Sequence, residues 1–423
     1  MEHKSCQDRV VKHFQEDKHQ VALDRAAELK QHIEGYSEAV KNIPTGFKLE
    51  EEYRARKKKI LEALGASEDN WHDWQWQMRN RIDDLETLRK LIPITEEEAG
   101  QIQRASEKFR WSVSPYYVSL MSTDNSDCPV RMQGIPGIKE LQDSWGKEDP
   151  MAEELTSPAP RITRRYADRL IINVTNQCAM FCRHCQRRRN IGEVDTPSPM
   201  EEIRAAIDYI KNHAEIRDVL ITGGDPLTLA DDKLDWILTA LDQIEHVEIK
   251  RIGSRTPVTM PQRITQELCD MLEKHHPLYL NTHFNHPKEV TQEALRATRM
   301  LAKAGISLGN QAVLLKGINN DPHVMKKLNH ELLKIHVRPY YIFHAKAVKG
   351  TTHFVPTVQE GLEIMENLRG YTSGLAIPWY IINAPGGAGK TPILPQYLLS
   401  MGRDYVLIRT WEGKVFRCAN GSI

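Results

Sequence analysis

The spacing of hydrophobic and polar positions changes once along the 423-residue chain, at about residue 169. Before about residue 110, apolar residues recur every three or four positions between Glu, Lys and Arg, which is typical of amphipathic helices. The segment "PITEEEAGQI" adds a helix start, because Thr95 is followed three residues later by Glu98. Trp71, Trp74 and Met78 lie at helical spacing, and we expect them to pack this helical region onto the rest of the chain.

From about residue 169, short β-branched runs alternate with helical stretches. The six runs are "RLIINVT", "DVLITGG", "VEIKRIGS", "LYLNTHF", "SLGNQAVLL" and "RPYYIFH". This alternation predicts an α/β protein with a parallel sheet and helices outside it. Six βα units are fewer than the eight that close a TIM barrel, so we expect an open or incomplete (β/α)6 barrel. One more strand, "PWYIIN", and a hairpin, "DYVLIRTWEGKVFRCA", should follow.

These patterns divide the chain into four regions. They are a helical N-terminal region (1–110), an irregular connector rich in Pro, Asp, Ser and Gly (111–165), the barrel (166–377) and a C-terminal extension with a loop and a β-hairpin (378–423). Polar residues gather where the predicted strands end, and this edge of a parallel sheet is where ligands bind. They are Thr175, Thr222 to Asp225, Ser254, His283, Asn285 and His344.

Charge and composition narrow the class of protein. The 57 basic and 57 acidic side chains cancel, so no overall field would attract nucleic acid or an anionic membrane. No apolar run approaches the ~20 residues of a membrane span, and "MEHKSCQDRVVKHFQEDKHQ" lacks the apolar core of a secretory signal. An odd number of cysteines, seven, argues against a disulfide framework. We therefore expect a cytoplasmic protein without nucleic-acid or membrane partners.

Three of the cysteines form a cluster directly after the first strand of the barrel. Cys178, Cys182 and Cys185 have C-x-x-x-C-x-x-C spacing. Three thiolates on one loop suit a 4Fe–4S cluster in which one iron stays open to an outside ligand. A structural zinc site normally has four ligands. That alternative would need a fourth from Cys128, Cys269 or His184.

A lysine that follows a glycine-rich segment lies near the C-terminus. Ala384 to Thr391 read A-P-G-G-A-G-K-T, close to the P-loop pattern G-x-x-x-x-G-K-S/T. A P-loop starts a helix directly after its lysine, whereas Pro392 and Pro395 would interrupt such a helix. The glycines therefore suit close approach to another phosphate-bearing ligand, with Lys390 as its anchor. A P-loop phosphohydrolase and a non-catalytic iron–sulfur or zinc protein remain alternatives.

Several segments carry a family resemblance. "CAMFCRHCQRRR", "ITGGDPL", "NTHFNHP", "GNQAVLLKGIN", "RPYYIFHAK", "LRGYTSG" and "NAPGGAGKTP" resemble, in this order, the lysine 2,3-aminomutase group of radical S-adenosylmethionine enzymes. The likeness runs from about Trp71 to the C-terminal hairpin. It implies an incomplete radical-SAM barrel and migration of an amino group between carbons 2 and 3, by way of a 5′-deoxyadenosyl radical. It also implies a 4Fe–4S cluster, S-adenosylmethionine, pyridoxal 5′-phosphate and an electron donor such as flavodoxin or ferredoxin.

The resemblance also implies roles for single residues. Cys178, Cys182 and Cys185 would hold the cluster, and Lys390 would carry pyridoxal phosphate as a Schiff base. The residues that match the contacts of S-adenosylmethionine are Gly223, Gly224, Asp225, His283 and Gln311. Arg165 and Arg169 match the arginines that bind the phosphate, and Arg187 the one that pairs with the substrate α-carboxylate. Arg188 and Arg189 could equally be surface charges.

Two positions depart from the lysine enzymes, which hold the distal ammonium of lysine with two aspartates. Here those positions are Lys346 and Asn383. A cation and a neutral amide would repel an ammonium and attract a carboxylate, so we expect L-glutamate as substrate and β-glutamate (3-aminoglutarate) as product. Aspartate is one methylene short, and a glutamate-using branch of the family is known. The alternatives are another amino acid, or that Lys346 is a surface lysine and Asn383 a loop residue.

A structural zinc site of the lysine enzymes has no counterpart here. Its internal cysteine corresponds to Asp321, and of its cysteine-rich C-terminal tail only Cys418 is present. Because that tail supports a tetramer, we expect a homodimer.

Overall fold

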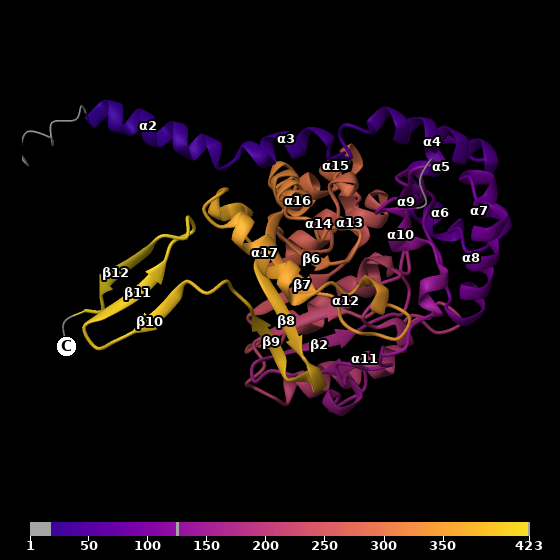
Figure 1. The fold of residues 1–423 in the computed structure, drawn as a ribbon. Coiled ribbons are helices and arrows are strands. Elements are labelled where there is room, and N and C mark those ends of the chain that lie inside the picture. The colour runs from indigo at the N-terminus through magenta and orange to yellow at the C-terminus, as the bar shows by residue number, and fades with distance from the viewer. Residues whose placement is uncertain (1–17, 124–126, 422–423) are drawn as a thin grey trace, which may run out of the picture. The chain divides into compact units, whose positions relative to one another are not determined.

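The computed structural model describes residues 18–123 and 127–421 (Figure 1). The expected helical pattern of residues 1–17, with Cys6, lies outside the described residues. The chain divides into two compact units, Met1–Ile43 and Pro44–Ile423. The first contains α2 (Lys18–Gln31) and α3 (Glu34–Asn42). The finer division predicted from the sequence, with boundaries at 110, 165 and 377, stays a prediction within the second unit.

The second unit begins with short helices, as the sequence predicts. They are α4 (Glu50–Ala63), α5 (Glu68–His72), α6 (Trp74–Arg79), α7 (Leu85–Leu91) and α8 (Glu96–Lys108). Thr95 starts α8, since its hydroxyl accepts a hydrogen bond from the amide of Glu98 at 3.2 Å. Trp71, Trp74 and Met78 do not share one helix, because Asp73 ends α5 and caps α6 through the amide of Gln75.

The break between α5 and α6 decides which aromatic side chains are buried in the core. Trp71 and Trp76 are buried, whereas Trp74 and Met78 are only partly buried. The connector that follows is mostly irregular and contains the short helices α9 (Pro115–Ser119) and α10 (Arg131–Gly134).

The main sheet curls through nine strands in the order β1 to β9 within the described residues (Figure 1). The strands are β1 (Ile162–Thr163), β2 (Arg169–Asn173), β3 (Asp218–Thr222), β4 (Ile249–Gly253), β5 (Leu278–Thr282), β6 (Ser307–Leu314), β7 (Arg338–His344), β8 (Trp379–Ala384) and β9 (Gly389–Pro392). Strands β2 to β8 are parallel, and β1 and β9 add to the two edges in antiparallel fashion. The edges do not pair with each other among the described strands, which confirms the predicted incomplete barrel.

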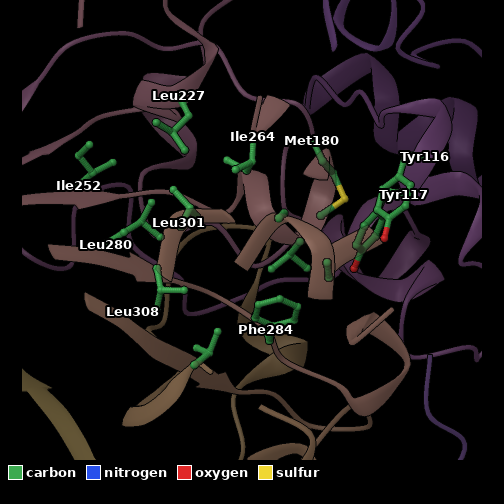
Figure 2. Packing of buried hydrophobic residues seen from close by; sticks show 14 of the residues in the cluster. Tyr116, Tyr117, Met180, Leu227, Ile252, Ile264, Leu280, Phe284, Leu301 and Leu308 are labelled. Carbon is green, nitrogen blue, oxygen red and sulfur yellow. The ribbon is translucent and has the colours of Figure 1, made fainter. Parts of the chain in front are cut away.

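Helices follow the strands in chain order. They are α11 (Met200–Lys211), α12 (Asp231–Asp242), α13 (Thr256–Thr259), α14 (Gln266–Leu272), α15 (Gln292–Lys303), α16 (Pro322–Lys334) and α17 (Val358–Leu368). Ile252, Leu280 and Leu308 of neighbouring strands and Leu301 of α15 belong to one buried cluster (Figure 2). Each such side chain contributes about 1.5–3 kcal/mol on burial. This packing makes the sheet a rigid support for the loops at its carboxyl edge.

The C-terminal extension forms a second sheet of three antiparallel strands. They are β10 (Leu398–Met401), β11 (Tyr405–Arg409) and β12 (Val415–Ala419). Strands β11 and β12 are the predicted hairpin, and β10 was not predicted. No helix in residues 18–123 and 127–421 combines the length and apolar character of a membrane span.

Candidate active site

One cavity of about 290 Å³ lies inside the curled sheet, and every site residue predicted from the sequence lines it. They are Arg165, Arg169, Cys178, Cys182, Cys185, Arg187, Gly223, Gly224, Asp225, His283, Gln311, Lys346, Asn383 and Lys390. The cysteines come from the loop after β2, the glycines from the turn after β3, and Lys346 from the segment after β7. The parallel topology thus gathers residues that are up to 225 positions apart in the sequence, from Arg165 to Lys390.

The cysteine loop is held in place by buried ion pairs. The guanidinium of Arg183 donates to Glu140 at 2.9 and 2.6 Å, and Arg188 also pairs with Glu140. Arg188 is buried and stacks on the ring of Phe109 at 3.8 Å, so the alternative that it is a surface charge is wrong. Because Arg183 lies between Cys182 and Cys185 and Arg188 follows Cys185, Glu140 fixes the path of the loop.

The three thiols suit an iron–sulfur cluster. The six cysteines of the described residues form no disulfide. Desolvation and the neighbouring Cys182 raise the pKa of Cys185 to about 11, and desolvation also raises that of Cys178. A bound metal would replace these protons and hold the thiolates. Three thiols that line one cavity fit a cluster that has one open iron.

The zinc alternative finds less support. Cys128 and Cys269 are buried elsewhere and do not line the cavity, which excludes both as a fourth ligand at this site. His184 does line it.

The glycine turn after β3 packs directly on the cysteine loop. A Cβ atom on Gly224 would lie 2.3 Å from the carbonyl oxygen of Gln177 and 2.6 Å from the carbonyl carbon of Asn176. Gly223 has φ of +127°, which a side chain rarely allows. The two glycines are therefore required for the close approach of the two loops.

Asp225 holds the turn that follows β4. One carboxylate oxygen accepts from the Ser254 hydroxyl at 2.6 Å, and the other from the amides of Arg255 and Thr256 at 2.8 and 2.9 Å. Burial raises the pKa of Asp225 despite these bonds. The structure thus uses Asp225 to fix Arg255, and its expected contact with S-adenosylmethionine stays a prediction.

His283 and Gln311 contact each other across β5 and β6. Nδ1 of His283 donates to the backbone carbonyl of Gln311 at 2.7 Å. Desolvation lowers the pKa of His283 to about 4, so its ring is neutral near pH 7 and its Nε2 is a hydrogen-bond acceptor. The pair can thus bind a polar ligand without adding charge.

Lys390 lies on β9, and no helix follows it in the described residues up to 421. Its backbone amide donates to the hydroxyl of Tyr166 at 2.9 Å, and its amino group lies over the rings of Tyr341 and Phe343 at 4.9 and 5.2 Å. Desolvation, with nearby Arg251 and Arg169, lowers its pKa to about 8. The strand geometry excludes a P-loop. An amine that is partly neutral near pH 7.5 suits a covalent anchor for pyridoxal phosphate.

A buried carboxylate, Glu153, joins the arginines of the site. It lies 3.0 Å from Nη2 of Arg165, 3.1 Å from Nη2 of Arg187 and 3.6 Å from Nη2 of Arg189. Burial would raise the pKa of Glu153, but Arg187 and Arg165 outweigh it and hold the pKa below its ordinary value. Arg189 also pairs with Asp149 at 3.0 Å, so it too is more than a surface charge.

The guanidinium groups of Arg165 and Arg169 suit the binding of a phosphate group. Nε of Arg165 is buried and has no hydrogen-bond partner in the part of the chain that the structure describes. Arg169 lies on the ring of Tyr166 at 4.0 Å and lines the same cavity. An anion with several oxygens could satisfy these donors.

The two positions that depart from the lysine enzymes both line the cavity. Desolvation, with Arg187 and Lys390 nearby, lowers the pKa of Lys346 to about 7, so the alternative of a surface lysine is wrong. Asn383 belongs to β8 rather than to a loop. Its Nδ2 is buried and finds no hydrogen-bond partner among residues 18–123 and 127–421. Both groups can donate to an anionic ligand.

The residues of the site that were not predicted from the sequence include the charged residues Glu153, Arg251 and Arg255. Glu153 lies in the irregular connector, where no pattern marks it. Arg251 lies in β4, and Arg255 lies two residues after the end of that strand. The position of Arg255 at a carboxyl strand end was the one available signal.

Comparisons with known proteins show which family the chain resembles. Residues 172–328 match the family model described as "Radical SAM superfamily", and residues 365–419 match the one described as "Lysine-2,3-aminomutase". The chain is 58% identical over 397 residues to a glutamate 2,3-aminomutase from Clostridioides difficile, with 94% of each chain covered. It is 50% identical over 351 residues to an L-lysine 2,3-aminomutase from Clostridium subterminale, covering 83% of this chain and 84% of that relative.

A solved structure is more distant. A radical SAM methyltransferase from Sphaerobacter thermophilus aligns with a TM-score of 0.38 at 13% identity, covering 52% of this chain and 68% of that one.

Proposed function

Since the chain belongs to the lysine 2,3-aminomutase family of radical S-adenosylmethionine enzymes, we propose that it interconverts L-glutamate and β-glutamate (3-aminoglutarate). Enzymes of this family are isomerases that use a 4Fe–4S cluster, S-adenosylmethionine and pyridoxal 5′-phosphate. Together these cofactors supply a carbon-centred radical and a conjugated ring that carries the amino group, chemistry that no side chain provides.

We assign the cofactors to the residues whose chemistry fits them. Cys178, Cys182 and Cys185 would hold the cluster, and Lys390 would bind pyridoxal phosphate covalently. Arg165 and Arg169 would bind its phosphate, since the buried Nε of Arg165 has no hydrogen-bond partner among the described residues. The groups left for S-adenosylmethionine are Gly223, Gly224, Asp225, His283 and Gln311, which line the same cavity.

We propose glutamate as the substrate because of the charged and polar groups that would face the far end of the substrate. Arg187 would pair with the α-carboxylate, while Lys346 and the unpartnered amide of Asn383 offer donors for a second carboxylate. A lysine substrate would place its ammonium against Lys346, and a buried charge without a partner costs several kcal/mol. The relative named glutamate 2,3-aminomutase supports the same choice.

The residues of the chain have separate tasks in this scheme. Arg187 and Lys346 would hold the two ends of the substrate and so orient the carbon that loses hydrogen. Lys390 must release a proton before it can act as a nucleophile, and its pKa of about 8 leaves a share of neutral amine near pH 7.5. Because its lowered pKa leaves the ring of His283 neutral near pH 7, this residue adds no second positive charge beside S-adenosylmethionine.

A product assay tests the proposal. The anaerobically purified and reduced protein, supplied with S-adenosylmethionine and pyridoxal phosphate, is incubated with L-glutamate, L-aspartate or L-lysine, and β-amino acids are measured by mass spectrometry. We expect β-glutamate as the main product. β-Lysine, or the product of another amino acid, as the main product would instead support the alternative, a lysine-2,3-aminomutase-like enzyme with a different substrate.

A pair of substitutions tests the pocket itself. Lys346→Asp with Asn383→Asp should lower the turnover of glutamate and admit lysine, because two carboxylates then face the substrate's end. Lys316→Asp, at an exposed lysine outside the cavity, is the matched control and should change neither. Unchanged glutamate turnover in the double variant would show that the pocket is assigned wrongly.

The remaining expectations stay predictions. They concern a one-electron donor such as flavodoxin or ferredoxin, a cytoplasmic location, a homodimer and the lack of a structural zinc site. Asp321, at the former zinc position, caps α16 by accepting from the amides of His323 and Val324 at 2.8 and 3.0 Å. Sedimentation analysis and metal analysis of the holoenzyme test the last two.

A further inference from the structure

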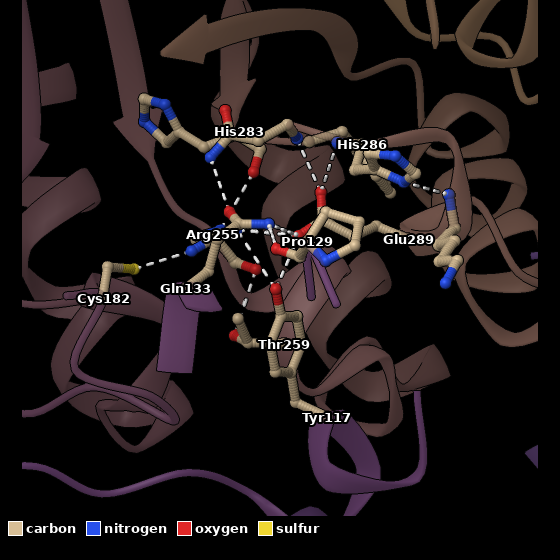
Figure 3. Close-up of polar contacts among 12 residues, drawn as sticks. Tyr117, Pro129, Gln133, Cys182, Arg255, Thr259, His283, His286 and Glu289 are labelled. Atoms are coloured by element: carbon tan, nitrogen blue, oxygen red, sulfur yellow. Dashed lines mark hydrogen bonds and ion pairs between the residues drawn. The ribbon is translucent and has the colours of Figure 1, made fainter. Parts of the chain in front are cut away.

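A buried arginine donates a hydrogen bond to one of the three cluster cysteines. Nη1 of Arg255 lies 2.8 Å from Sγ of Cys182 (Figure 3). Arg255 follows β4, 73 positions along the chain from Cys182, and it belongs to neither the cysteine loop nor the glycine turn. The backbone of Arg255 is fixed from the other side, since its amide donates to the carboxylate of Asp225 at 2.8 Å.

The rest of the guanidinium is held by buried acceptors. Nε donates to the carbonyl of His283 at 3.0 Å, and Nη2 donates to Gln133 at 2.6 Å and to Glu289 at 2.9 Å (Figure 3). Gln133 and Glu289 are fully buried. Glu289 also accepts from the hydroxyl of Tyr117 at 2.6 Å. Because Nε and Nη2 are held by these acceptors, the guanidinium cannot turn away, and Nη1 stays directed at the sulfur.

We propose that Arg255 is a positioning residue that sets the reduction potential of the iron–sulfur cluster through its hydrogen bond to Cys182. The inference rests on the cysteine assignment made under the proposed function. A donor to a ligating sulfur draws electron density from the metal, and hydrogen bonds to the sulfurs are among the factors that set cluster potentials. A charged donor acts more strongly than a neutral one.

The electron balance needs no group beyond an outside donor. Reduction adds one electron to the cluster from a low-potential one-electron donor, and no proton moves, because a guanidinium stays protonated throughout. The added negative charge is stabilised by the positive charge of Arg255. Its hydrogen bond to Cys182 therefore favours the reduced state and raises the potential.

Glu289 should act in the opposite direction. Its carboxylate partly cancels the charge of Arg255, and charges interact strongly in a buried region. Replacing Glu289 by a neutral residue of the same shape would leave more positive charge near Cys182. The pair therefore predicts shifts of opposite sign, which general damage to the site would not produce.

Redox titration followed by electron paramagnetic resonance tests the proposal on the reconstituted enzyme without S-adenosylmethionine. Arg255→Gln should lower the midpoint potential, Arg255→Lys should lower it less because the charge remains, and Glu289→Gln should raise it. Arg263→Lys is the matched control, because Arg263 is also a buried arginine but binds Leu227 and Asp231 instead of a cysteine. Unchanged potentials in the Arg255 variants, even with weaker binding of S-adenosylmethionine, would overturn the proposal.

A second measurement keeps Arg255 in place and so covers the case in which the Arg255 and Glu289 variants do not fold. In protein carrying arginine with ¹⁵N-labelled guanidinium groups, pulsed resonance spectra of the reduced cluster should show coupling to an arginine nitrogen. A labelled Arg81→Lys sample excludes Arg81, which donates to the carbonyl of Cys178 at 2.6 Å. Absence of the coupling overturns the role of Arg255. A chain that takes up no iron and sulfide at all overturns the cysteine assignment as well, so the two failures are distinguishable.

Discussion

Asn383 and Lys390 face each other across the antiparallel pair of β8 and β9. The residue proposed to select the substrate and the residue proposed to anchor pyridoxal phosphate are thus cross-strand neighbours on one ladder. Cross-strand neighbours have Cβ atoms about 4.5–5.5 Å apart, and the pairing fixes them relative to each other. This arrangement lets the C-terminal extension bring the cofactor and the end of the substrate together.

Replacing Lys390 should abolish covalent binding of pyridoxal phosphate. Lys390→Met keeps the length of the side chain but has no amine, so kcat should fall by about 10³-fold or more. Borohydride reduction followed by mass spectrometry of peptides measures the covalent adduct. Lys346→Met keeps Lys390 and should retain the adduct. An adduct that persists in Lys390→Met would show that another lysine is the anchor.

The lysines predict a dependence of activity on pH. Lys346 has a pKa of about 7 and must carry a proton to bind a carboxylate, so kcat/KM for glutamate should fall as pH rises above about 7. Lys390 has a pKa of about 8 and must lose its proton, so the rate of covalent binding of pyridoxal phosphate should rise up to about pH 8. Steady-state kinetics measure kcat/KM at each pH, and stopped-flow measurements give the rate of cofactor binding.

A substitution separates the two profiles. Lys346→Gln should remove the fall of kcat/KM above pH 7 and leave the rise in cofactor binding in place. If the fall remains in this variant, another group than Lys346 causes it.

The elements with strong periodic patterns were predictable from the sequence. Strands β2 to β8 begin or end within a few residues of the expected runs, because buried parallel strands are rich in β-branched residues. Strand β9 reads Gly-Lys-Thr-Pro, and Gly and Pro are poor strand formers, so only pairing with β8 makes it a strand. The helix boundary at Asp73 was not predicted, because helical spacing of Trp71, Trp74 and Met78 does not reveal it.

The cavity-lining residues that stand in motifs could be picked out from the sequence. The cysteine loop, the glycine turn and Lys390 stand in recognisable local patterns. Glu153 and Arg255 act through contacts that lie 34 and 73 positions away in the chain. Such contacts depend on the tertiary structure, and no local motif in the sequence marks the residues that make them.

Removing the charge of Glu153 should lower the stability of the protein, and added anions should restore part of that stability. Glu153→Gln leaves the guanidinium groups of Arg165 and Arg187 without their common carboxylate, and breaking such a buried pair costs about 3–5 kcal/mol. The Tm should fall, and pyridoxal phosphate or inorganic phosphate should raise it more than in the unmutated protein. Thermal unfolding with and without phosphate measures both effects.

A surface carboxylate provides the comparison. Glu215→Gln removes an exposed partner of Arg164 and should leave the Tm essentially unchanged, because exposed pairs contribute little. If phosphate raises the Tm of Glu153→Gln no more than that of Glu215→Gln, the arginines do not form an anion site.

Gly224→Ala should disturb the cysteine loop and, through it, the loading of iron. The added Cβ would lie 2.3 Å from the backbone oxygen of Gln177, one residue before Cys178, and a backbone atom cannot move aside without moving the loop. We expect a lower iron and sulfide content after anaerobic reconstitution, with secondary structure retained by circular dichroism. Gly100→Ala, in α8 with no atom within 4 Å of the new Cβ, should load normally and be slightly more stable. Normal loading of Gly224→Ala would mean that the two loops can separate without loss of the cluster site.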